Sequence, residues 1–165
     1  MSDINFCIRC GHAVERRMVE GKPRPVCPAC NHIHFIDPKV AAAIIVEREG
    51  KVLLTRRANT PRQGLWVTPG GFVDDDEDPA QAAARECEEE TGLKVEIVEL
   101  LDLIAGREWP GGASFVIFYR ARIVGGALTA GDDADRVAFF GPDELPEIAF
   151  ESTRKMLEKW RSQNV

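Results

Sequence analysis

Four of the five cysteines in this chain lie within its first thirty residues, and they restrict how that segment can fold. They form two C-x2-C pairs, Cys7 with Cys10 and Cys27 with Cys30, which are separated by sixteen residues. This spacing is typical of a structural zinc site, in which four thiolates surround one ion. Two disulfides or four ordinary buried cysteines are the alternatives, and a reducing compartment disfavours the disulfides. Because so short a segment seldom folds without a staple, we predict a zinc ribbon over residues 1–36.

The remaining composition is that of a folded chain without a membrane span. Its 165 residues suffice for one ordinary domain plus a small appendage, and 44% of them are apolar. The longest apolar run, Val40–Val46, is far shorter than the ~18 residues that suggest a spanning helix. The N-terminus has no basic and apolar signal region, so we expect a cytoplasmic protein. The net charge of −6 argues against nonspecific binding to nucleic acid or to an anionic membrane.

A main domain is predicted over residues 37–165, after the chain break at Asp37-Pro38. Its clearest helix begins at Asp78, a good N-cap, and ends before Gly92, which is a common residue just past a helix. Strand patterns and a second helix with one apolar face indicate an α+β domain with a mixed sheet and helices on its faces. The predicted strands cover residues 40–46, 51–55, 65–67, 94–104, 114–124 and 137–140, and the predicted helices cover 79–91 and 150–161.

The predicted helix 79–91 carries a cluster of glutamates. Glu86, Glu89 and Glu90 stand at positions i, i+3 and i+4, so their carboxylates share one face. Negative charge near the C-terminal end of a helix opposes the helix dipole, which stability alone would not select. Three convergent carboxylates suit a hard cation such as Mg²⁺ or Mn²⁺, and an ordinary solvated face is the alternative.

The spacing around this helix resembles the sequence box of the Nudix hydrolases. Gly71 is followed after five residues by Glu77, and after seven more by the run Arg85 to Leu93. Only Cys87, at a position that is usually aliphatic, departs from the box, and a buried cysteine behaves as a small hydrophobe. The resemblance implies a Nudix-type α/β/α sandwich and a hydrolase that cleaves a nucleoside diphosphate linked to another group.

The predicted ribbon narrows the resemblance to two groups of Nudix enzymes. NADH pyrophosphatases and a group resembling plant FAD and ADP-ribose pyrophosphatases both place a four-cysteine ribbon before the catalytic domain. The junction Cys30 to Val40 is similar to that of the second group, and the Ser-Gln-Pro-Trp-Pro-Phe-Pro run of NADH pyrophosphatases is missing. The resemblance therefore implies a small-molecule nucleotide substrate, with FAD and ADP-ribose the leading candidates and a nucleic-acid partner disfavoured.

The resemblance also assigns roles to box residues. Glu86, Glu89, Glu90 and the main-chain carbonyl of Gly71 match metal ligands of the family. Glu77 and Arg85 match positions that organise the loop and the helix by charge pairing. Either Glu89 or Glu86 is the expected general base, although some family members take this carboxylate from a later loop. Asp133 is the candidate there, with an ordinary turn aspartate as the alternative. The expected catalytic residues are Glu86, Glu89, Glu90, Arg85 and Asp133.

The expected substrate-binding residues are Arg56, Trp66 and Phe150, and Arg57, Arg62 and Arg107 are further arginines that could bind pyrophosphate. An arginine would bind pyrophosphate and an aromatic ring would stack on adenine, whereas surface charge and core packing are the alternative explanations. Three other functions stay open: an NADH pyrophosphatase, a hydrolase of RNA caps or nucleoside triphosphates, and a nonenzymatic ligand sensor that binds nucleic acid through its ribbon. The family also implies that two copies can associate as a homodimer.

Overall fold

A computed structural model describes residues 4–163 of the chain. The chain divides into two compact units, Met1–Pro38 and Lys39–Val165, which are described separately. In the first unit, β1 (Glu15–Val19) and β2 (Lys22–Val26) form an antiparallel hairpin in which Glu15 lies opposite Val26. Two cysteine-bearing turns flank this hairpin in the sequence, at residues 7–11 and 27–31.

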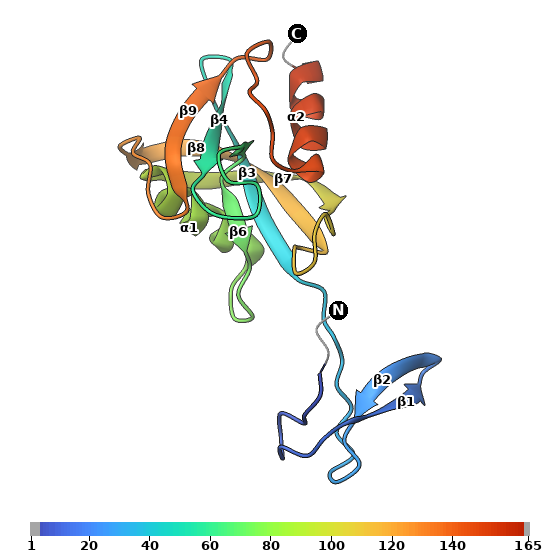
Figure 1. Cartoon of the computed structure of the whole chain (residues 1–165). Helices are drawn as coiled ribbons and strands as arrows, with labels where there is room; N and C mark the ends of the chain where they lie inside the picture. Colours follow the sequence, from blue (N-terminus) through green and yellow to red (C-terminus); the bar gives the residue numbers. More distant parts are fainter. Residues whose placement is uncertain (1–3, 164–165) are drawn as a thin grey trace. The chain divides into compact units, whose positions relative to one another are not determined.

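The second unit is built on one seven-stranded mixed sheet (Figure 1). The path β5-β4-β3-β8-β7 runs through the sheet, while β6 also pairs with β3 and β9 with β4. The β3–β8 pair is parallel and the other pairs are antiparallel. The strands are β3 (Val40–Arg48), β4 (Lys51–Arg57), β5 (Trp66–Val67), β6 (Gly70–Phe72), β7 (Leu93–Ala105), β8 (Phe115–Gly126) and β9 (Ala134–Phe140), and the helices are α1 (Pro79–Thr91) and α2 (Glu151–Gln163).

The two helices cover opposite faces of the sheet. Alternate residues of β3 point to opposite sides of the sheet, and each set packs with one of the helices. Ala43 and Ile45 pack in the cluster that contains Met156, Leu157 and Trp160 of α2. Ala42, Ile44 and Val46 pack in the other cluster, with Ala82, Ala83 and Cys87 of α1. This arrangement of a mixed sheet between two helices confirms the predicted fold class.

Helix α1 begins and ends where its capping residues predict. The side chain of Asp78 accepts a hydrogen bond from the Ala80 amide, Pro79 occupies the first turn, and Gly92 adopts the left-handed conformation at φ 69°. The small residues of α1 pack directly on the sheet, and Cys87 is fully buried among them. Two glutamates of α1 lie against β6, where Glu90 accepts a hydrogen bond from the Gly70 amide and the Glu86 carboxylate approaches Gly71.

Candidate active site

Strand β6 brings two glycines against β3 and α1. Gly71 lies opposite Ala42 of β3, and a Cβ atom placed on Gly71 would come within 2.3 Å of a Glu86 carboxylate oxygen. A Cβ atom on Gly70 would come equally close, 2.3 Å, to the Ala42 carbonyl oxygen. At Gly70 a Cβ atom would clash with fixed backbone, so this position requires glycine, whereas at Gly71 the flexible Glu86 side chain would have to move away. The main-chain carbonyl of Gly71 belongs to the same short segment.

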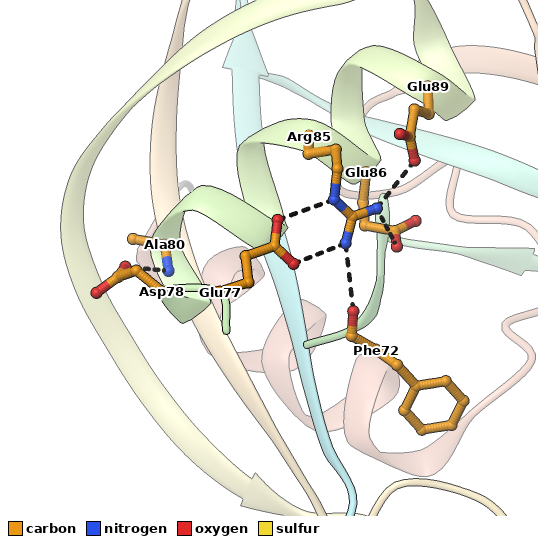
Figure 2. Close-up of polar contacts among 7 residues, drawn as sticks. All are labelled: Phe72, Glu77, Asp78, Ala80, Arg85, Glu86 and Glu89. Carbon is orange, nitrogen blue, oxygen red and sulfur yellow. Dashed lines mark hydrogen bonds and ion pairs between the residues drawn. The ribbon is translucent and has the colours of Figure 1, made fainter. Parts of the chain in front are cut away.

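Arg85 organises the acidic side chains at the start of this site (Figure 2). Its guanidinium donates two hydrogen bonds of 2.9 Å to the two carboxylate oxygens of Glu77. The same group donates to Glu86 at 2.9 Å and to Glu89 at 3.0 Å. Bidentate pairing fixes the geometry of both partners, and the hydrogen bonds to Glu77 are the main reason that the Arg85 pKa is raised. Arg85 thus ties the loop before α1 to two of the box glutamates.

Glu90 is the most deeply buried of the box glutamates. It is 6% exposed, accepts a hydrogen bond of 3.2 Å from the Gly70 amide, and lies 3.4 Å from the Thr55 hydroxyl. Burial raises the pKa of Glu90 to about 8 and also raises that of Glu86. A divalent cation beside these oxygens would favour their charged form, and carboxylate oxygens are the ligands that Mg²⁺ and Mn²⁺ prefer. The donor set therefore fits a hard divalent cation.

A cavity of about 470 Å³ opens beside these carboxylates. Glu86, Glu90 and Gly71 line one part of it, and Arg57, Trp109 and Phe150 line another. The rings of Trp109 and Phe150 stack with their centroids 4.6 Å apart and their planes inclined by 22°. The Arg57 guanidinium lies 5.1 Å from the centroid of the Phe150 ring. The cavity thus joins acidic oxygens to an aromatic and cationic wall.

The four cysteines of the N-terminal unit converge on one point. In each turn the amide that follows the second cysteine donates to the carbonyl of the first, from Gly11 to Cys7 at 2.8 Å and from Asn31 to Cys27 at 2.9 Å. All four sulfur atoms lie within 4.8 Å of one another. Within residues 4–163 this is the one group of three or more cysteine, histidine or acidic ligand atoms gathered so closely. The arrangement suits a tetrahedral zinc ion.

Two protein families match this chain. Residues 37–160 match the family described as NUDIX domain, and residues 5–35 match the family described as Nudix N-terminal, a zinc ribbon. The chain belongs to the NUDIX family. Its predicted membership, its ribbon and its assignment as a pyrophosphohydrolase are thereby confirmed. Nudix hydrolases use divalent metal ions, in agreement with the carboxylate cluster.

Several relatives of this Nudix hydrolase have a named activity. It is 36% identical over 131 residues to an ADP-ribose pyrophosphatase of Methanocaldococcus jannaschii, covering 79% of this chain and 78% of the relative. It is 28% identical over 151 residues to the NAD-capped RNA hydrolase NudC of Stutzerimonas stutzeri, covering 90% of this chain but only 52% of that relative. A crystal structure of a NUDIX hydrolase from Nitrosomonas europaea has a TM-score of 0.86 and 36% identity, and the match covers 97% of this chain and 92% of that one. Among residues 4–163, no helix has the length and apolar character needed to cross a membrane.

Asp133 of this Nudix hydrolase lies at the cavity, together with its neighbour Asp132. The Asp133 carboxylate accepts a hydrogen bond from the Asn59 side chain, and its carbonyl accepts one of 2.7 Å from the Ala58 amide. Asp132 has φ 47°. The pKa of Glu86 is raised first by burial and then by the charges of Glu89 and Asp132, while the contacts with Arg85 lower it. The turn at residues 131–134 therefore supplies two carboxylates to the cavity, of which the sequence singled out one.

Only one of the three predicted substrate-binding residues lines the cavity. Phe150 lines the cavity, whereas Arg56 and Trp66 do not. Arg56 forms a bidentate pair with Asp135 at 2.7 and 2.9 Å, and Trp66 packs edge-on against Phe140 with ring centroids 4.8 Å apart. Two other residues line the cavity, Arg57 and Trp109. Arg57 was one of the arginines considered as a pyrophosphate ligand, whereas Trp109 was not predicted, and an aromatic residue before a Pro-Gly-Gly turn is the weak signal that could have indicated it.

Proposed function

We propose that this Nudix pyrophosphohydrolase acts on ADP-ribose with Mg²⁺ or Mn²⁺ and releases AMP and ribose 5-phosphate. One observation carries the proposal: acidic ligands and a stacked aromatic pair line the same cavity. Its volume of about 470 Å³ lies in the range of small-molecule sites. The relative that is 36% identical and named ADP-ribose pyrophosphatase supports this choice of substrate.

In this proposal Glu86, Glu89, Glu90 and the Gly71 carbonyl hold the divalent ions. Bound ions would neutralise the pyrophosphate oxygens, orient the attacking water and stabilise the leaving phosphate. Arg85 and Glu77 keep the carboxylates in place through the hydrogen bonds described above. The close approach of Gly71 to Glu86 sets the spacing between the β6 carbonyl and the helix.

The protein's own part in the chemistry is a proton transfer. Water adds to one phosphorus atom, the P–O bond of the bridging oxygen breaks, and a carboxylate takes the proton of the water. We assign this step to Glu89, which is not among the residues that line the cavity but whose side chain is 44% exposed and can meet water, whereas Glu90 is buried. Asp133 is the second candidate, since it faces the cavity from the later turn.

The other wall of the cavity would bind the nucleotide. Arg57 provides a positive charge for the pyrophosphate, and it is already oriented by a hydrogen bond of 2.8 Å from its Nε to the Pro61 carbonyl. Trp109 and Phe150 provide flat surfaces on which adenine can stack. FAD contains the same adenosine diphosphate half as ADP-ribose, so it is the next substrate in this proposal.

A second candidate is hydrolysis of NADH or of an NAD cap on RNA. The match to NudC favours it, because that match covers 90% of this chain. A panel of ADP-ribose, FAD, NADH, NAD-capped RNA and nucleoside triphosphates, each with Mg²⁺ and Mn²⁺ and with products identified by mass, tests both candidates. The proposal expects the highest kcat/KM with ADP-ribose. Preference for NADH or capped RNA would replace it with the second candidate.

The ribbon completes the proposal as a structural zinc module. Cys7, Cys10, Cys27 and Cys30 would bind Zn²⁺ as thiolates, which requires a reducing compartment such as the cytoplasm. We also propose that the boundary between the two domains lies after residue 36 and that two copies of the chain associate as a homodimer. A nonenzymatic sensor is disfavoured, since all the box glutamates are present.

A further inference from the structure

Glu108 caps a helix that lies far from it in the sequence. Its carboxylate accepts hydrogen bonds from the Glu151 amide at 2.7 Å, from the Ser152 amide at 3.0 Å and from the Ser152 hydroxyl at 3.0 Å. These groups are the first residues of α2. The first amides of a helix lack partners within the helix, and the preceding residue here is Phe150, whose side chain cannot accept a hydrogen bond. Glu108 supplies the missing acceptor, and its charge suits the helix dipole.

The neighbour of Glu108 makes a second contact with the same end of α2. Trp109 stacks on Phe150, the residue immediately before the helix. Both Glu108 and Trp109 belong to the segment 106–114, which joins β7 to β8 and lines the cavity. The base of this segment is closed by a hydrogen bond of 3.0 Å from the Gly106 amide to the Ser114 carbonyl. The cap and the ring stack are therefore adjacent links between one loop and one helix end.

We propose that Glu108 is a positioning residue, which holds the segment 106–114 on α2 so that the Trp109–Phe150 wall is formed before substrate arrives. The inference rests on the proposed function, because it assigns that wall to the nucleotide. A wall that is ordered beforehand lowers the entropy lost on binding. Glu108 also lines the cavity, and we assign its effect on affinity to its hold on the loop that carries Trp109, since its carboxylate accepts hydrogen bonds from the start of α2.

The substitution Glu108→Ala should raise KM roughly tenfold, the effect of a few lost hydrogen bonds to one charged group, and leave kcat within about twofold. Glu108→Gln keeps one oxygen acceptor and should fall between the wild type and Glu108→Ala. The control is Asp143→Ala, which removes a 2.6 Å contact with Arg161 on the same helix but outside the cavity lining. KM is measured with whichever nucleotide of the panel the wild type hydrolyses.

Trypsin provides a readout that does not depend on activity, because Arg107 is exposed and directly precedes Glu108. The rate of cleavage after Arg107, followed by mass, is divided by the rate for a peptide of residues 101–116 that carries the same substitution, because an acidic residue after the cleaved bond itself slows trypsin. This ratio should be higher in both Glu108 variants than in the wild type and in Asp143→Ala. An unchanged ratio would show that Glu108 does not hold the loop. A higher ratio with an unchanged KM would also overturn the inference, since the loop would then not position the substrate wall. A wild type without activity on ADP-ribose would instead count against the proposed substrate, and the cleavage rates would still decide the role of Glu108. Should Glu108→Ala fail to fold, Glu108→Gln carries both measurements.

Discussion

Both carboxylate oxygens of Glu77 accept hydrogen bonds of 2.9 Å from the guanidinium of Arg85, eight residues further along the chain. This ion pair attaches the acidic loop of residues 74–78 to α1. The same guanidinium reaches Glu86 and Glu89, so the position of the loop and the orientation of two box glutamates depend on one side chain. Glu77 therefore acts on the site through Arg85.

The Glu77–Arg85 pair predicts a pH dependence of stability. Arg85 lowers the pKa of Glu77 from its ordinary value of 4.5, mainly through the side-chain hydrogen bonds. A lowered pKa in the folded state contributes stability above the unfolded value, and this contribution is lost as the pH falls through the folded value. Thermal unfolding of the wild type should therefore lose more stability between pH 5 and pH 3 than that of Glu77→Gln. Parallel curves for the two proteins would contradict the assigned pairing.

Divalent cations should stabilise the folded protein through the box glutamates. A ligand that binds only the native state at a hundred times its Kd adds about 2.7 kcal/mol to the free energy of unfolding. We expect Mg²⁺ or Mn²⁺ to raise the Tm of the wild type in this way and to raise that of Glu90→Gln much less. Glu88→Gln is the matched control, since Glu88 lies on the same helix and pairs with Lys94 at 3.5 Å. Equal metal responses in Glu90→Gln and Glu88→Gln would remove Glu90 from the site.

The elements whose ends are set by local chemistry were the ones predicted well from the sequence. The predicted helix 79–91 has the bounds of α1, because Asp78, Pro79 and Gly92 fix both ends through short-range contacts. The box spacing likewise placed Glu86, Glu89 and Glu90 on one face. Charge pairing of Arg85 could be expected from the sequence. Its four hydrogen bonds to Glu77, Glu86 and Glu89 could not, because they depend on the geometry of the loop between residues 72 and 78.

Two neighbouring arginines provide the sharpest test of the nucleotide wall. Arg57 lines the cavity and Arg56 is paired with Asp135, so Arg57→Ala should raise KM for ADP-ribose by roughly tenfold to a hundredfold, the range of a lost charge-assisted hydrogen bond. Arg56→Ala should change KM less, as judged from initial rates over a range of substrate concentrations. A larger effect at Arg56 would restore the expectation from the sequence and reject the role of Arg57.

The sequence could not choose between Arg56 and Arg57 because the choice depends on sheet register. The pairing of β4 with β9 shifts register between Arg56, which lies opposite Arg136, and Arg57, which lies opposite Ala134, and a short sequence does not show such an irregularity. The direction of the Trp66 side chain could not be predicted either, because β5 has only two residues. The Trp66 ring packs on Phe140 of β9. The contact between Glu108 and α2 spans more than forty residues and has no local signal.

The four-cysteine cluster predicts a zinc content of one ion per chain. Cys27→Ser should lose the ion and make the N-terminal unit sensitive to proteases, because a segment of this size depends on its metal. Cys87→Ser should keep the ion, since Cys87 is buried against the sheet in the other unit. Elemental analysis of the purified proteins measures both outcomes. Loss of zinc from Cys87→Ser, or its retention in Cys27→Ser, would contradict the assignment.

We propose above that the carboxylates of α1 drive a metal-dependent cleavage of ADP-ribose in the cavity that Arg57, Trp109 and Phe150 line. The most direct measurement is the mass of the products formed from ADP-ribose by the wild type, with and without Mg²⁺, beside Glu89→Gln and its control Glu88→Gln. We expect AMP and ribose 5-phosphate only with the divalent ion, a kcat lowered roughly 10²- to 10⁴-fold in Glu89→Gln, and near-normal turnover in Glu88→Gln. Cleavage that persists in the presence of a chelator, or a wild type that hydrolyses no nucleoside diphosphate derivative, would contradict it.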